Sequence, residues 1–211
     1  MELNNQKTVQ GWYFFDWANS AYALVITATI FPAYYNTVTK EAFQGEIVSF
    51  LGFPINNTVL YSYALSFSFL IITVLSPFLS GIADYGGRKK PFMRFFTTLG
   101  SFACMSLFFF TGENIELGII GTILASVGFT GSMVFYNAFL LEIVTPDRYD
   151  EVSAKGFTYG YVGSVILLIV NLLMVQHPDW FMLPNAGFAA RLSFLMVGIW
   201  WLLFSQITFQ R

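Results

Sequence analysis

The chain has 211 residues, of which 56% are hydrophobic, 19% aromatic and only 10% charged, and its formal net charge at pH 7 is −2. A soluble domain carries about 25% charged residues, so this composition excludes an ordinary soluble domain and indicates lipid as the solvent. The single cysteine, Cys104, lies within an apolar stretch, which excludes an intramolecular disulfide and a cysteine-rich metal site.

Six long apolar stretches predict six transmembrane helices and an all-α membrane protein. We expect them near residues 12–35, 58–82, 92–111, 115–141, 152–176 and 187–208. Each has about the 20 apolar residues that a helix needs to cross the hydrocarbon core. They are too long for the strands of a membrane barrel, and open strands would leave backbone groups unpaired in lipid. The N-terminal segment has no cleavage site and is expected to act as a signal anchor.

A polar stripe marks the first stretch. Its members recur at spacings of three and four, which places them on one helical face: Asp16, Asn19, Ser20, Ala23 and Thr27. Such a face is costly against lipid and should line a cavity or another helix. Asp16 then either binds a proton or a substrate ammonium group, or only anchors the start of the helix, with Asn19, Ser20 and Tyr22 offering hydrogen bonds to a polar solute. Trp12 is expected at the membrane interface.

A short basic loop separates the second and third stretches and sets the predicted orientation. If the N-terminus is cytoplasmic, the inner segments carry eight Lys and Arg residues: Lys7, Arg88, Lys89, Lys90, Arg94, Arg148, Lys155 and Arg211. The outer segments carry only Lys40 and Arg191. Positive residues accumulate on the cytoplasmic side, so both termini are expected there. The outer segments 36–57 and 177–186, the second of which holds the only histidine, His177, are predicted to be solvated loops.

Small residues recur every four positions in the fifth stretch, as Gly156-x-x-x-Gly160-x-x-x-Ser164. Such spacing lets helix backbones approach closely, so packing is the expected role. Asn137, late in the fourth stretch, and Asn171, in the fifth, are candidates for a polar lining, although hydrogen bonds between helices would satisfy them equally well.

The segment Ser80-Gly-Ile-Ala-Asp84-Tyr-Gly-Gly87-Arg88-Lys89 resembles the loop 2–3 signature of the major facilitator superfamily, G-x-x-x-D-x-x-G-R-K/R. Ser80 and Tyr85 depart from that pattern. Three further segments resemble the branch named for a fungal vacuolar amino-acid effluxer linked to autophagy, which has bacterial relatives: Gly11-Trp-Tyr-Phe-Phe-Asp16-Trp-Ala-Asn-Ser-Ala-Tyr22, Ser76-Pro77 and Phe135-Tyr-Asn-Ala-Phe-Leu-Leu-Glu142.

The resemblance implies one half of a major-facilitator fold. The chain would be a single six-helix domain over 1–211, made of two inverted three-helix repeats at about 11–111 and 115–211. It also implies a cytoplasmic gating loop, in which Asp84, Gly87, Arg88 and Lys89 form a charge network with helix ends. Glu142 and Arg148 are the expected partners. The alternative is that these charges serve only to fix the topology.

The function implied is transport of a small solute, such as an amino acid, across a bacterial plasma (inner) membrane by alternating access. A second six-helix half, either a second copy or a separate chain, would complete the cavity, and the chain is expected to be an N-terminal half of a longer protein. The alternative is a non-transporting scaffold or an inactive fragment. No enzymatic motif, cofactor, metal site or nucleic-acid surface is expected, and the partners are the bilayer and the solute.

Overall fold

The computed structural model describes residues 3–86 and 89–211, and the side chains of all of these except 82–86. Its elements follow the chain in this order: α1 (Gln6–Ala21), the π-helix η1 (Tyr22–Thr27), α2 (Ile30–Phe43), β1 (Ile47–Phe50), β2 (Phe53–Asn56), α3 (Asn57–Gly86), α4 (Lys89–Ser106), η2 (Leu107–Phe109), α5 (Ile115–Ile143), η3 (Pro146–Arg148), α6 (Tyr149–Gln176), η4 (Pro178–Phe181) and α7 (Ala186–Phe209). The helical character predicted for the apolar stretches is therefore confirmed.

Within the described residues, five helices are long and apolar enough to cross a membrane. They span Asn57–Gly81, Lys89–Phe109, Ile115–Ile143, Pro146–Gln176 and Ala186–Phe209, close to the predicted stretches. The sixth crossing, predicted at 12–35, is not a continuous α-helix, because α1, η1 and α2 share it. A sixth crossing and the two three-helix repeats therefore stay predictions.

The first stretch is interrupted where β-branched residues gather. The segment Val25-Ile-Thr-Ala-Thr-Ile30 contains five of them, whose stiff side chains lower helix propensity. There the α-helix widens into η1, and Thr29 leaves the helical region with φ −126° and ψ −76°. The Thr29 hydroxyl donates to the carbonyl oxygen of Leu24 at 2.7 Å and satisfies an acceptor that the break exposes.

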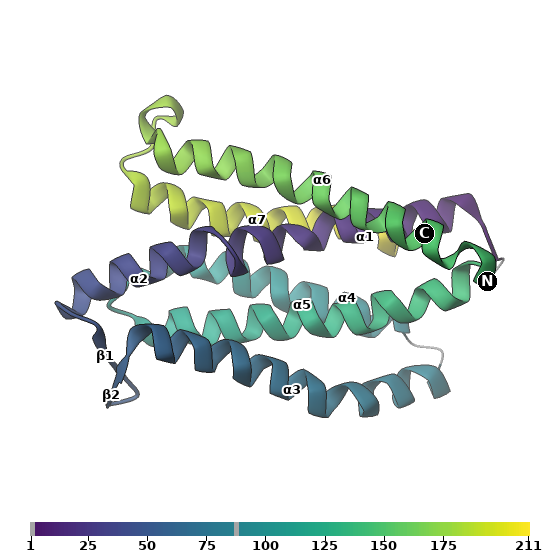
Figure 1. Cartoon of the computed structure of the whole chain (residues 1–211), viewed down its shortest axis with the longest axis horizontal. Coiled ribbons are helices and arrows are strands. Elements are labelled where there is room, and N and C mark those ends of the chain that lie inside the picture. The colour runs from purple at the N-terminus through teal and green to yellow at the C-terminus, as the bar shows by residue number, and fades with distance from the viewer. Residues whose placement is uncertain (1–2, 87–88) are drawn as a thin grey trace.

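The long helices alternate in direction along the chain and form a bundle in which α6 and α3 occupy opposite sides (Figure 1). Helices α1, α4, α5 and α7 lie between them, and both ends of the chain lie at one end of the bundle, away from β1 and β2 (Figure 1). Large apolar side chains on α3 and α6 face outward, among them Phe67 and Phe78 of α3 and Phe157 and Tyr161 of α6. Such apolar outer faces suit lipid and would be a liability in water.

The close crossing of α4 and α5 depends on two glycines. A Cβ added at Gly128 would lie 2.4 Å from the Cα of Gly100, which leaves no room for a side chain there. On the other side of Gly100, the ring of Trp201 from α7 fills the space that its own side chain would occupy. Dispersion forces across such close contacts hold helices together where lipid removes the hydrophobic driving force.

The prediction that residues 36–57 form only a loop is wrong. Helix α2 continues to Phe43, and β1 and β2 pair antiparallel as a hairpin with Phe50 opposite Phe53. Leu51 and Gly52 at its turn have φ 51° and 84°, the left-handed conformation that a two-residue hairpin turn requires. Buried Asn57 then ties α3 to α2, because its side-chain amide donates to Asn36 and Thr39.

Candidate functional site

The carboxyl group of Asp16 is buried in the interface between α1 and α6, with only 3% of the residue exposed. The Ser20 hydroxyl, one turn along α1, donates to Asp16 Oδ1 at 2.9 Å. Gly160 of α6 faces this pair, and a Cβ added there would lie 2.6 Å from Ser20 Oγ and 2.9 Å from Asp16 Cγ. The polar stripe predicted on the first stretch therefore faces another helix at Asp16.

Trp12 lies on α1 one turn before Asp16, where α1 contacts Tyr136 of α5 as well as α6. The rings of Trp12 and Tyr136 stack with centroids 4.2 Å apart, and Trp12 Nε1 donates to the carbonyl oxygen of Tyr136 at 2.9 Å. A Cβ at Gly156 would lie 2.4 Å from the Trp12 ring. The packing role predicted for Gly156 and Gly160 is confirmed. Trp12 itself does not face lipid, because it is 5% exposed and its indole bonds to a buried partner on α5, and its depth in the membrane stays a prediction.

The Tyr136 hydroxyl is buried, lies near enough to the Asp16 carboxyl group to interact with it electrostatically, and forms no hydrogen bond with any described residue. A Cβ at Gly156 would lie 2.9 Å from this hydroxyl, so α6 closes over it. The carboxyl group thus has one hydroxyl bonded to it, a second one close by and, among the described residues, no ion pair with a cation. Such a group can accept a proton or the ammonium group of a solute.

The other candidates on the first stretch point elsewhere. Asn19 donates to Met133 Sδ at 3.0 Å, and its buried Oδ1 has no hydrogen-bond partner among the described residues. Tyr22 is 2% exposed and shares a hydrogen bond of 2.7 Å with Ser126 Oγ, so its hydroxyl is already bonded. The structure therefore brings Asp16 and Ser20 together, while Asn19 and Tyr22 contact α5.

Asn137 and Asn171 lie in different surroundings. Asn137 is exposed on α5, next to Tyr136. Asn171 on α6 is fully buried, and neither of its side-chain polar atoms has a partner in the described structure. Gly156 of α6 lies against Trp12 and Gly160 lies against Asp16, so α1 and α6 run side by side in the same direction. If this pairing continues along α6, Asn171 lies at about the level of η1. Both residues stay predicted lining residues.

Comparison with known protein families matches nearly the whole chain to one of them. Residues 4–210 match the family model described as "Vacuole effluxer Atg22 like". The chain belongs to this Atg22-like family. The expected resemblance to the effluxer branch of the major facilitator superfamily is thereby confirmed.

Several curated proteins are similar to this Atg22-like chain. An uncharacterized MFS-type transporter of Bacillus subtilis, YxiO, is 34% identical over 200 residues, which is 94% of this chain and 45% of the relative. Autophagy-related protein 22 of Gibberella zeae is 28% identical over 184 residues, covering 76% of this chain and 27% of the relative. The chain thus spans less than half the length of these relatives. No solved structure matches it.

The gating loop predicted for an Atg22-like chain is described only in part. The side chain of Asp84 and residues Gly87 and Arg88 lie outside the described residues. Lys89 at the start of α4 forms an ion pair with Glu142 of α5, whereas Arg148 Nε pairs with Glu151 Oε2 at 3.5 Å within its own segment. A link between helix ends thus exists through Lys89 and Glu142, and the gating role stays a prediction.

The sequence places Tyr136 on a stripe of small and polar residues in the fourth stretch, but sequence reasoning did not connect Tyr136 or Met133 with the first stretch and did not predict the π-helix. Tyr136 belongs to a long apolar helix, and only the fold brings its hydroxyl to Asp16. The β-branched run of 25–30 was an available signal for the break. In the described part of the chain, no group of three or more His, Cys, Asp or Glu side chains could hold a metal ion.

Proposed function

We propose that the chain is one six-helix half of a secondary transporter for small polar solutes, amino acids among them, completed by a second copy or a separate second half. Membership of the Atg22-like family supports a transport role, and YxiO, of which the chain covers 45%, is named an MFS-type transporter. Transporters of this architecture place the solute between two such halves.

The buried carboxyl group of Asp16 is the observation that carries the proposal. A carboxylate inside a membrane protein is costly unless it is protonated or paired with a cation. Ser20 supplies one hydrogen bond, and the described residues supply no cation. Binding of a proton or a solute ammonium group to Asp16 would remove the unpaired charge, and its release would restore it. Alternating between these two states couples the site to transport.

The proposed orientation places both termini in the cytoplasm of a bacterial cell, with the protein in the inner membrane. Seven of the nine described Lys and Arg residues belong to segments at the end of the bundle that carries both termini: Lys7, Lys89, Lys90, Arg94, Arg148, Lys155 and Arg211. Only Lys40 and Arg191 belong to the other end, and this asymmetry is the distribution that cytoplasmic segments show. The hairpin of β1 and β2 would then face outward.

Solute counterflow in proteoliposomes tests the proposal. The purified chain is reconstituted into proteoliposomes, the vesicles are loaded with unlabelled amino acids, and the same amino acids in labelled form are added outside. We expect uptake by the wild type and a marked loss of uptake in Asp16→Asn, because an amide can neither take up a proton nor pair with an ammonium group as a carboxylate does. Asp179→Asn, which changes an exposed acid in η4, is the matched control and should transport normally. Full activity of Asp16→Asn would remove Asp16 from the mechanism.

The oligomeric mass in detergent separates transport from the alternative. A dimer that shows counterflow supports self-completion of the cavity. A strict monomer without flux for any amino acid would favour the scaffold or fragment, and joint expression with a second half would then decide whether a separate chain is the partner.

A further inference from the structure

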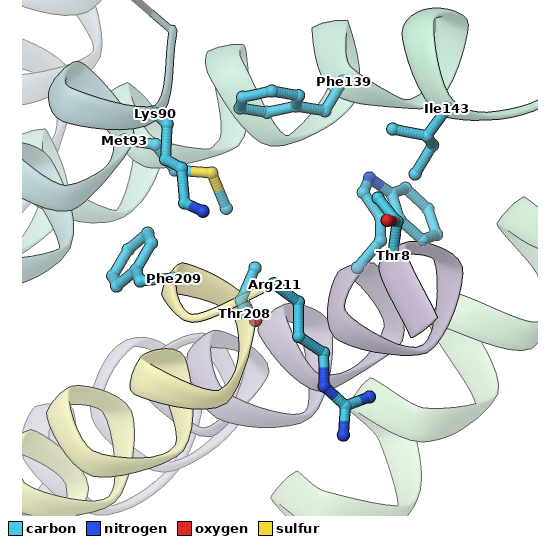
Figure 2. A pocket seen from close by; sticks show the side chains of 9 residues that line it. Thr8, Lys90, Met93, Phe139, Ile143, Thr208, Phe209 and Arg211 are labelled. Carbon is cyan, nitrogen blue, oxygen red and sulfur yellow. The ribbon is translucent and has the colours of Figure 1, made fainter. Parts of the chain in front are cut away.

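The end of the bundle that carries both termini is hollowed beside α4. A cavity of about 50 Å³ lies between α1, α4, α5 and α7. A wider open hollow of about 620 Å³ adjoins it along α4, and Lys90 and Phe209 line both. Figure 2 shows the Lys90 side chain reaching into the cavity beside Met93, with Phe139 and Ile143 of α5 across from it.

Two cations of α4 face this hollow on the same side of the helix. Lys90 and Arg94 are four residues apart, about 6 Å along the helix axis. The Arg94 guanidinium carbon lies 5.1 Å from the centroid of the Phe209 ring, a cation–π contact that orients the group and leaves its N–H donors at the edge.

Neither cation is neutralised by an acidic residue within the described structure, whereas Lys40, Lys89, Arg148 and Lys155 each form an ion pair. The lining of the cavity and of the hollow contains no Asp or Glu. In addition, α4 begins at Lys89, so the positive end of its dipole lies beside Lys90. The charges that the described residues present to the hollow therefore favour an anion.

Arg211, the third cation beside the cavity, does not point its charged group into it (Figure 2). Its guanidinium turns away from the cavity (Figure 2) and donates to the Lys7 carbonyl oxygen and to Gln10 Oε1, both at 3.4 Å. Its aliphatic stem forms part of the wall, and the charged head lies over α1. The anion site thus depends on Lys90 and Arg94.

Further along α4, the hollow continues onto an apolar surface. Phe95 and Phe102 are 59% and 57% exposed, and Thr98 lies between them on the same side of the helix. Arg94, Thr98 and Phe102 follow one another at intervals of four residues. A ligand with an anionic head and a long apolar tail would cover cations and phenylalanines together, whereas a small soluble anion would leave the phenylalanines bare.

We propose that Lys90 and Arg94 bind the headgroup phosphate of an anionic phospholipid, with its acyl chains along Phe95 and Phe102. Basic pockets beside transmembrane helices are suited to such headgroups. The site lies at the end of α4 and makes no use of Asp16, so it is independent of the transport proposal.

Native mass spectrometry of the chain in neutral detergent tests the site. Phosphatidylglycerol and phosphatidylcholine with the same acyl chains are titrated separately, and we expect adducts with phosphatidylglycerol at concentrations where phosphatidylcholine gives few. The double variant Lys90→Gln/Arg94→Gln should bind phosphatidylglycerol about 30-fold more weakly, because each cation beside an anionic headgroup contributes about a factor of five. Lys90→Gln alone, which removes no ion pair that the described residues make, should weaken binding about fivefold.

The matched control is Arg148→Gln/Lys155→Gln, which removes two charges at the same end of the bundle but outside the hollow. It should bind phosphatidylglycerol as the wild type does. Equal binding of both lipids, or wild-type binding by both Lys90 variants, would overturn the proposal. Displacement of the lipid by inorganic phosphate alone would also overturn it, in favour of a site for the free anion.

Discussion

Asp16 Cγ and Gly160 Cα belong to adjacent helices that approach so closely that a Cβ on residue 160 would lie 2.9 Å from the carboxyl carbon. The absence of a side chain on α6 is therefore what allows a buried acid on α1. The same contact that packs the two helices also shields the carboxyl group from lipid. Gly160 therefore serves both the helix packing and the candidate site.

Substitution of Gly160 by alanine should destabilise the protein. The added methyl group collides with Asp16 and Ser20, and overpacking of this kind costs about 1–3 kcal/mol. Thermal unfolding in detergent measures the effect. Gly81→Ala is the control, because a Cβ there meets nothing within 4 Å, and alanine is the better helix former. Equal melting temperatures for the wild type and Gly160→Ala would contradict the contact.

Removal of the Tyr136 hydroxyl should separate stability from transport. The Phe variant keeps the ring stacked on Trp12 and loses no hydrogen bond within the described structure, so stability should change by less than about 1 kcal/mol. Counterflow should fall, since the hydroxyl is a close electrostatic neighbour of the Asp16 carboxyl group. Thermal unfolding and flux are measured on the same preparation, with Tyr161→Phe, an exposed ring on α6, as the control. A variant that transports like the wild type would exclude the hydroxyl from the site.

Much of this architecture follows from sequence, and the exceptions have physical reasons. Hydropathy and length located the five long helices to within a few residues, because each needs an apolar surface matched to the bilayer. The spacing of Gly156 and Gly160 predicted close packing. The burial of Trp12 could not be predicted, because amphipathic rings suit both a lipid-facing position and a buried partner, and only tertiary contact with Tyr136 decides between them. The hairpin was missed because its strands have four residues each.

Acid should loosen the end of the hairpin. Lys40 Nζ lies 3.0 Å from Glu46 Oε1, and the hydrogen bond from Lys40 holds the pKa of Glu46 below its usual value. A lowered folded-state pKa means that the stabilising contribution is present above the pKa of the unfolded chain and is lost as the pH falls through the folded value. Amide hydrogen exchange of β1 should therefore be slower in the wild type than in Glu46→Gln at neutral pH, and the two rates should converge as the pH falls and Glu46 becomes protonated. Glu41→Gln, an exposed acid of α2 outside this pair, should leave the exchange unchanged.

Labelling from the two sides of the membrane tests the orientation. Cys104 is fully buried, so a Cys104→Ala background gives a chain without thiols into which single cysteines are introduced. Phe53→Cys, at the hairpin turn, replaces a side chain that is 74% exposed, and Lys7→Cys replaces an exposed one near the start of α1. The two positions lie at opposite ends of the bundle (Figure 1), so an impermeant maleimide added to intact cells should label the first and reach the second only after the cells are opened. Labelling of Lys7→Cys in intact cells would reverse the orientation and place the Lys90 and Arg94 site at the outer leaflet.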